Sequence, residues 1–143
     1  MLALGCDHGG YELKGEIKKY LDKKGIPYKD FGCDSKEPVD YPVYAKKVAR
    51  AILSGECDKG ILICGTGIGI SITANKFQGI RAALCTDCFS AEATRLHNDA
   101  NVLALGGRVV GTGVALKIVE TFLNTPFSGE ERHKNRIAQM ETE

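Results

Sequence analysis

A cysteine followed by a glycine-rich turn is the part of this sequence best suited to chemistry. Cys64 precedes glycines at positions 65, 67 and 69. Because glycines let backbone N–H groups converge at the start of a helix, such a turn can hold a phosphate, or an oxyanion that develops during a reaction. The same N–H groups and the helix dipole favour a thiolate at Cys64, which makes it a candidate base or nucleophile. Two plainer interpretations stay open: the glycines could serve only a tight strand-to-helix turn, and Cys64 could be an inert buried thiol.

The turn matches neither of two common nucleotide-binding motifs. A dinucleotide fingerprint that starts at Gly65 would need glycine at position 70, where Ile70 stands, and the Gly-Lys-Ser/Thr of a P-loop does not occur. Cys85 and Cys88 have Cys-x-x-Cys spacing, but they have neither a second pair nor the companion histidines of a zinc site. We therefore predict an anion site without a metal, and we attribute the Cys85–Cys88 spacing to chance.

Two histidines and two arginines are further candidates. His8 and His97 flank predicted strand ends, where a general acid or a phosphate ligand would be useful, although either alone could be a surface histidine. Arg132 and Arg136 are four residues apart, so they share one face of a helix and can grip a phosphate together. A solvated helix face is the alternative, because two glutamates precede this pair and dilute its charge.

Strand-like and helix-like segments alternate along the chain and would position these residues. Strands are expected at 2–6, 26–31, 59–64, 80–85 and 102–105, and helices at about 13–24, 42–53, 68–75, 89–97, 114–123 and 130–140. The nearly unbroken apolar run at 59–64 is typical of a central strand. The alternation predicts an α/β fold: a single-domain, doubly wound, Rossmann-like sheet of about five parallel strands with helices on both faces. Ligands of such sheets bind beyond the carboxyl ends of the strands.

Length and composition limit the class of protein. The chain has 143 residues, 43% of them hydrophobic and 26% charged, which suits one ordinary globular domain over 1–143. Nineteen basic and eighteen acidic residues leave a net charge of +1, so we expect no general attraction to nucleic acid or to a membrane surface. Neither a membrane span nor a secretory signal is visible, so we expect a cytoplasmic protein whose six cysteines are mostly free thiols.

Several segments of the chain together match one known family. The most specific are the Cys64 turn and the His-Asn-Asp-Ala-Asn segment at 97–101. The others are Gly5 to Gly9, Asp40 to Pro42, Gly60 to Gly69, Ala74 to Lys76 and Arg132 to Arg136. Through essentially its whole length the chain thus resembles the ribose-5-phosphate isomerase type B family. The wider family includes allose-6-phosphate and galactose-6-phosphate isomerase subunits.

The resemblance implies a cofactor-free and metal-independent aldose–ketose isomerase of the pentose phosphate pathway. It would interconvert ribose 5-phosphate and ribulose 5-phosphate through an enediolate. Cys64 would move the proton between C2 and C1, Thr66 would move the proton between the two oxygens, and His97 would open the furanose ring. The remaining residues that the resemblance places at the substrate are Asp7, His8, Tyr41, Gly65, Gly67, Ile68, Gly69, Asn98, Arg108, Arg132 and Arg136.

The resemblance also implies how the phosphate is held and how copies of the chain assemble. His8, Arg108 and the arginine pair of the terminal helix, at about 129–141, would bind the phosphate. The chain would form a homodimer, which could pair again into a dimer of dimers, and the partner would supply His97, Asn98 and Arg108. Two alternatives remain: an isomerase of a six-carbon sugar phosphate such as allose 6-phosphate, and a non-catalytic phosphate- or nucleotide-binding α/β module. The second would need the glycine turn and the arginines but not Cys64, Thr66 or His97.

Overall fold

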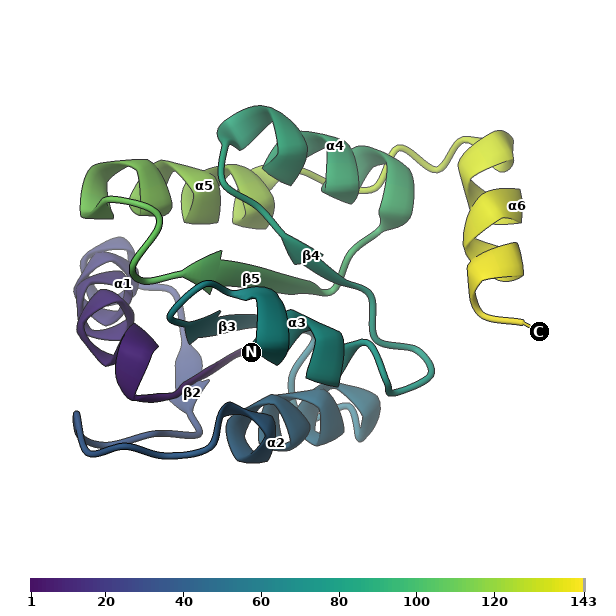
Figure 1. The fold of residues 1–143 in the computed structure, drawn as a ribbon. Coiled ribbons are helices and arrows are strands. Elements are labelled where there is room, and N and C mark those ends of the chain that lie inside the picture. The colour runs from purple at the N-terminus through teal and green to yellow at the C-terminus, as the bar shows by residue number, and fades with distance from the viewer. Residues whose placement is uncertain (143) are drawn as a thin grey trace.

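Five parallel strands form one sheet at the centre of the computed structural model, which describes residues 1–142 (Figure 1). The strand order is β2-β1-β3-β5-β4. The strands are β1 (Leu2–Cys6), β2 (Tyr28–Asp30), β3 (Lys59–Cys64), β4 (Ala82–Leu84) and β5 (Val102–Gly106). The predicted doubly wound parallel sheet is therefore confirmed.

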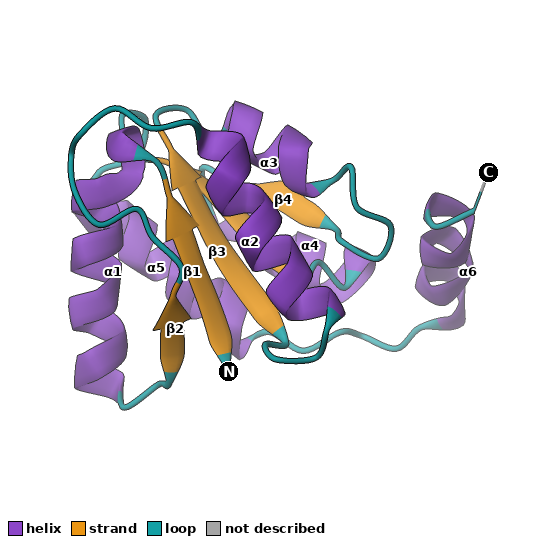
Figure 2. Cartoon of the chain, turned by 90° about the horizontal axis from the view of Figure 1, so that it is seen from below, coloured by secondary structure: helices purple, strands orange, loops and turns teal. Residues whose placement is uncertain are grey.

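Helices cover both faces of the sheet, and α2 runs diagonally across one of them (Figure 2). Helices α1, α4 and α5 pack on one face, and α2 and α3 pack on the other. The short 3-10 turn η1 joins β1 to α1, and α6 stands apart from the rest of the fold (Figure 1). The helices are η1 (His8–Gly10), α1 (Tyr11–Lys24), α2 (Tyr41–Leu53), α3 (Ile68–Ala74), α4 (Cys88–Asn98), α5 (Thr112–Asn124) and α6 (Glu131–Met140).

Alternate residues of each central strand face the two helical layers, as the period of two in a strand requires. In β3, Ile61 and Ile63 pack toward α1 and α5, whereas Leu62 and Cys64 pack toward α2 and α3. All four side chains are almost fully buried. The continuous apolar run at 59–64 is thus explained by burial on both faces.

The two edge strands are shorter than the sequence predicted. Expected strands at 26–31 and 80–85 are three-residue strands in the structure, Tyr28–Asp30 and Ala82–Leu84. Each pairs with a neighbour on one side only, β2 with β1 and β4 with β5. A strand with one neighbour has fewer ladder hydrogen bonds at its ends than a central strand, so its paired segment is shorter. Its flanking apolar residues still pack on the core.

The strand order decides where a ligand can bind. The chain leaves β1 for β2 on one side and later returns to β3 on the other side of β1. Crossover connections therefore diverge between β1 and β3, and such a topological switch point opens a crevice beyond the carboxyl ends of the two strands. Residues 7–10 and 64–69 lie at this point, because Cys6 pairs with Ile63 in the register of β1 and β3.

A buried lysine holds the turn that follows β2. Lys14 is 1% exposed, and its Nζ lies 2.7 Å from Asp30 Oδ1 and 2.6 Å from the carbonyl oxygen of Cys33. Lys18 Nζ lies 3.0 Å from the other oxygen of Asp30. Partial burial alone would raise the pKa of the Asp30 carboxyl, but the hydrogen bonds from Lys14, Gly32 and Lys18 outweigh burial and lower that pKa.

We expect Asp30→Ala to destabilise the protein by about 3 kcal/mol at neutral pH, because it leaves the Lys14 ammonium buried without its counter-ion. The Asp30 pKa is lower in the folded chain than in the unfolded one. Its contribution is therefore present above the unfolded pKa of about 3.9 and is lost as pH falls through the folded value. Urea unfolding at pH 7 and pH 3 checks this, with Asp34→Ala, an exposed acid in the same segment, as control. An equal difference between variant and parent at both pH values would contradict it.

Candidate active site

Cys64 ends the central strand β3 and faces the first turn of α3. Its side chain is buried, and its Sγ accepts a hydrogen bond from the backbone N–H of Gly67 at 3.1 Å. This hydrogen bond fixes the sulfur at the start of the glycine turn. Gly67 has φ +80°, a left-handed conformation that turns the chain from strand to helix and that favours glycine. The glycine turn thus serves both the tight connection and the environment of the thiol.

Three loops meet around Cys64 with their backbones in contact. The turn after β5 donates to the Cys64 loop, from Gly107 N to the Cys64 oxygen at 2.8 Å and from Arg108 N to the Gly65 oxygen at 3.0 Å. A Cβ added at Gly107 would stand 2.5 Å from the carbonyl oxygen of Gly9, in the loop after β1. Glycine is therefore required there, because any side chain would force the loops apart.

The loop after β1 adds an acid and an imidazole with fixed orientations. Asp7 is 6% exposed, and its Oδ1 accepts the N–H of Gly9 at 2.9 Å. Nδ1 of His8 accepts the N–H of Val39 at 3.1 Å. The neutral His8 ring therefore carries its proton on Nε2, which can donate to an anion.

Tyr41 and Arg108 complete the surroundings of the glycine turn. Tyr41 opens α2, and its hydroxyl lies 2.7 Å from the place where a Cβ of Gly69 would be. Arg108 lies beside the turn of its own chain, with a guanidinium nitrogen 3.2 Å from the corresponding position at Gly65. The resemblance had implied that the partner supplies Arg108, whereas a single chain already holds this residue at the Cys64 loop. Thr66 is exposed at the tip of the turn, where its Oγ1 accepts the N–H of Ile68.

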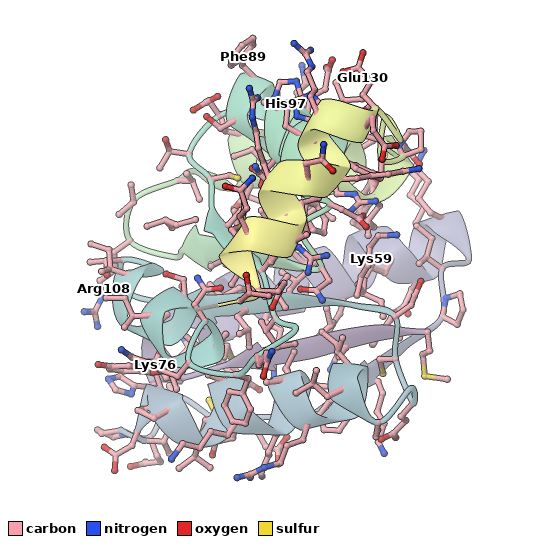
Figure 3. All side chains as sticks on the ribbon, turned by 90° about the vertical axis from the view of Figure 1, so that its right-hand side faces the viewer. Lys59, Lys76, Phe89, His97, Arg108 and Glu130 are labelled. Atoms are coloured by element: carbon pink, nitrogen blue, oxygen red, sulfur yellow. The ribbon has the colours of Figure 1, made fainter. Side chains whose placement is uncertain are left out.

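His97 and Asn98 lie at the opposite edge of the sheet. They end α4, which runs back from the carboxyl edge to the amino edge, just before β5 begins. Figure 3 shows His97 next to Glu130 and α6, well away from Arg108. One chain alone therefore does not bring His97 to Cys64.

The two arginines of the terminal helix accompany His97. Arg132 and Arg136 are exposed on α6, which stands on the side away from the tip of β5 (Figure 1). Arg132 pairs with Glu130 at 3.1 Å. The candidate site residues thus form two groups: Asp7, His8, Tyr41, Cys64 to Gly69 and Arg108 at the carboxyl edge, and His97, Asn98, Arg132 and Arg136 at the amino edge.

A groove of about 1040 Å³ runs between α6 and the segment that joins α3 to β4. Asn98 contributes to its wall, together with Lys76, Arg81 and Met140. The groove is bridged by an ion pair of 2.7 Å between Arg81 and Glu141, which attaches the end of α6 to the sheet. Of the amino-edge group, Asn98 therefore borders a hollow large enough to receive part of another molecule.

One residue of this neighbourhood was missed in the sequence. His133 is buried, and its ring stacks on that of His97 with the ring centroids 4.5 Å apart. Its position could have been found from the spacing of His133 and Ile137, which share the inner face of an otherwise polar helix.

The remaining sequence expectations concern thiols, metals and membranes. All six cysteines are free thiols in the structure. Among residues 1–142, no cluster of three or more His, Cys, Asp or Glu side chains could hold a metal ion. Over the same residues no helix combines the length and the apolar character that a membrane crossing requires.

Comparison with known proteins finds similar proteins over almost the whole length of the chain. Residues 2–140 match the family model described as Ribose/Galactose Isomerase. The chain is 52% identical to ribose-5-phosphate isomerase B of Escherichia coli, over 95% of this chain and 91% of that one.

Two solved structures are similar to this chain in both sequence and fold. Ribose-5-phosphate isomerase B of Clostridium thermocellum superposes with a TM-score of 0.96 at 55% identity, over 98% of this chain and 94% of that one. The isomerase of Thermotoga maritima superposes with a TM-score of 0.96 at 53% identity, over 98% and 96%. The fold, the loops around Cys64 and these similarities agree, and the chain belongs to the Ribose/Galactose Isomerase family.

Proposed function

We propose that this protein interconverts ribose 5-phosphate and ribulose 5-phosphate without a cofactor, with Cys64 as the base. The observation that carries the proposal is the Gly67 N–H bond to Cys64 Sγ at the switch point of the sheet. The names of the similar proteins support the five-carbon substrate. The family description also covers galactose, so a six-carbon sugar phosphate such as allose 6-phosphate is the second candidate.

The reaction balances as two proton transfers. The Cys64 thiolate removes the proton from C2 of the open-chain aldose, and the negative charge moves to the carbonyl oxygen as an enediolate. Backbone N–H groups of residues 65–69 stabilise that oxyanion, and Thr66 carries a proton between the two oxygens. The proton on Cys64 then returns to C1 and yields the ketose. Electrons stay within the sugar, so the exchange consumes no oxidant or reductant.

We further propose a homodimer in which each site combines the carboxyl-edge group of one chain with the amino-edge group of the other. The separation of His97 from Cys64 within one chain supports this arrangement. Exposed apolar side chains near the Cys64 loop also support it, since they would be covered in a dimer. These are Ile68, Ile72, Leu84 and Val109.

The proposed substrate is tested by measuring isomerisation of ribose 5-phosphate and allose 6-phosphate side by side, with EDTA in excess. We expect turnover of ribose 5-phosphate with the higher kcat/KM and no loss on chelation. A higher kcat/KM for allose 6-phosphate would transfer the assignment to six-carbon substrates. Binding of both sugars without turnover of either would identify a binding module instead of an enzyme.

We expect Arg132→Ala and Arg136→Ala each to raise KM by about tenfold, because each removes a charge-assisted hydrogen bond to the phosphate. kcat should fall less than KM rises, since neither arginine is expected near C1 or C2. Lys134→Ala is the matched control: it removes one exposed positive charge from the same helix, but two residues from either arginine and therefore on another face. Arginine variants whose KM equals that of the Lys134 variant would refute the phosphate assignment.

A further inference from the structure

His133 is the buried residue near the beginning of α6. Of the ten described residues of this helix, His133 alone is buried, at 5% exposure. Its ring stacks on the ring of His97, with centroids 4.5 Å apart and planes inclined by 21°. Figure 3 shows His97 at this end of α6. The stack therefore joins the end of α4 to the start of α6.

The polar edge of the His133 ring makes no aligned hydrogen bond. Its Nε2 lies 3.1 Å from Glu130 Oε2, yet this buried nitrogen has no hydrogen-bond partner within the described chain. Burial, followed by the positive charges of Arg132 and of a protonated His97, lowers the pKa of His133. The ring is accordingly neutral near pH 7. The His133 ring therefore contacts its surroundings through its flat face and not through a specific hydrogen bond.

The far end of α6 is fixed by different contacts. Glu141 accepts hydrogen bonds from Arg81 at 2.7 Å and from the N–H of Gly79 at 3.0 Å. Eight residues separate this contact from His133, or about 12 Å along a helix. Two attachments therefore set the position of α6, and the one at its beginning is the histidine stack. Arg132 precedes the histidine attachment by one residue, and Arg136 lies between the two attachments.

An exposed histidine at the end of a helix has several accessible rotamers, and His97 is exposed. A second flat ring packed against it removes most of that freedom, because rotation would break the stack. The same contact fixes the distance between the His97 imidazole and the two arginines. The distance between a ring-opening imidazole and the phosphate-binding arginines must be fixed, because the furanose ring and the phosphate belong to one small molecule.

We propose that His133 is a positioning residue for His97: the stack holds the ring-opening imidazole in one orientation and at one distance from the phosphate-binding arginines. This inference rests on the proposed function, in which His97 opens the sugar ring. His133 touches neither the substrate nor the reacting atoms. It acts through His97 and through the placement of α6.

The test compares His133→Ala, which removes the stack, with His133→Phe, which keeps a flat ring without nitrogen. With ribose 5-phosphate, the rate for His133→Ala should fall about tenfold or more at high enzyme concentration. The rate should also reach a plateau as the enzyme concentration rises. Spontaneous ring opening, which does not depend on the enzyme, then limits the supply of open-chain substrate. Ribulose 5-phosphate cannot form a furanose, so its rate should stay proportional to enzyme concentration. His133→Phe should restore proportionality for both sugars.

Glu141→Ala is the matched control for a loosened helix. It releases the other end of α6 without touching the stack, so we expect a higher KM for both sugars and no plateau with enzyme concentration. A His133→Ala protein with a rate on ribose 5-phosphate that stays proportional to enzyme would overturn the inference. A His133→Phe protein as impaired as His133→Ala would overturn it as well.

A spectroscopic measurement separates this inference from the proposed function. The chain has three histidines, so the imidazole signals are few enough to assign by substitution. The ring protons of His97 should lie upfield in the unmodified protein and in His133→Phe, and should move downfield in His133→Ala. Turnover of neither sugar by the unmodified protein would defeat the proposed function. Unchanged His97 signals in His133→Ala would defeat the stack.

Discussion

Replacing Cys64 with alanine is expected to lower kcat for ribose 5-phosphate by about 10²- to 10⁴-fold, which is the usual loss when a general base is removed. No other thiol or carboxylate follows β3 at the glycine turn. Steady-state assays in both directions measure the effect. Cys64→Ser should be equally inactive, because a serine hydroxyl stays protonated at neutral pH.

The matched control is Cys85→Ala, which removes another buried thiol that follows a strand tip. Burial, reinforced by Asp87, raises the pKa of Cys85 to about 11, so this thiol stays protonated at neutral pH. Cys85→Ala should therefore retain the unmodified rate. Circular dichroism and thermal unfolding should show that all three variants remain folded. Near-normal turnover by a folded Cys64→Ala protein would remove Cys64 from the mechanism.

Mixing two variants that each fail on ribose 5-phosphate is expected to restore activity toward that sugar if each site uses both chains. A Cys64→Ala chain retains His97, and a His97→Asn chain retains Cys64. In a heterodimer of the two, one site carries both lesions and the other carries neither. After equal mixing and full subunit exchange, about half of the dimers are heterodimers with one intact site, so about a quarter of the unmodified activity should return.

This expectation follows from the geometry of α4. The helix returns from the carboxyl edge of the sheet to its amino edge, so His97 at its end lies away from Cys64 of the same chain. Mass spectrometry of differently labelled chains establishes that exchange has occurred, and a mixture of two Cys64→Ala preparations is the negative control. No recovery after proven exchange, or a monomer in sedimentation velocity, would show that the site is not shared.

Local sequence was sufficient to predict most elements, because their causes are local. The run Lys59–Cys64 has the predicted bounds, since a strand buried on both faces must be apolar throughout. Asp40 and Pro42 mark the beginning of α2, where the N-cap and the first turn favour these residue types. The predicted edge strands were too long, because apolar residues at 26–31 and 80–85 contribute to core packing as well as to strand pairing. Sequence alone does not distinguish these two roles.

The candidate residues after β1 and β3 were also predicted from sequence, because the carboxyl ends of parallel strands share one edge. Their adjacency was not, since it depends on the strand order and on the register that pairs Cys6 with Ile63. The contacts among Gly9, Gly65 and Gly107 join residues far apart in the chain, and only the folded backbone reveals that a side chain would not fit between them.

The sequence by itself determined the fold class and the glycine turn, and it supplied the candidate reactive side chains, because these depend on short-range patterns and residue chemistry. Only the tertiary structure decided how those residues are grouped. It separates Cys64 from His97, keeps Arg108 beside its own Cys64 loop, and stacks His133 on His97. These relations follow from which faces of α4 and α6 bury against each other and where the crossovers end. The spacing of His133 and Ile137 indicates which face of α6 points inward, but no periodic signal in the sequence indicates that this face meets His97.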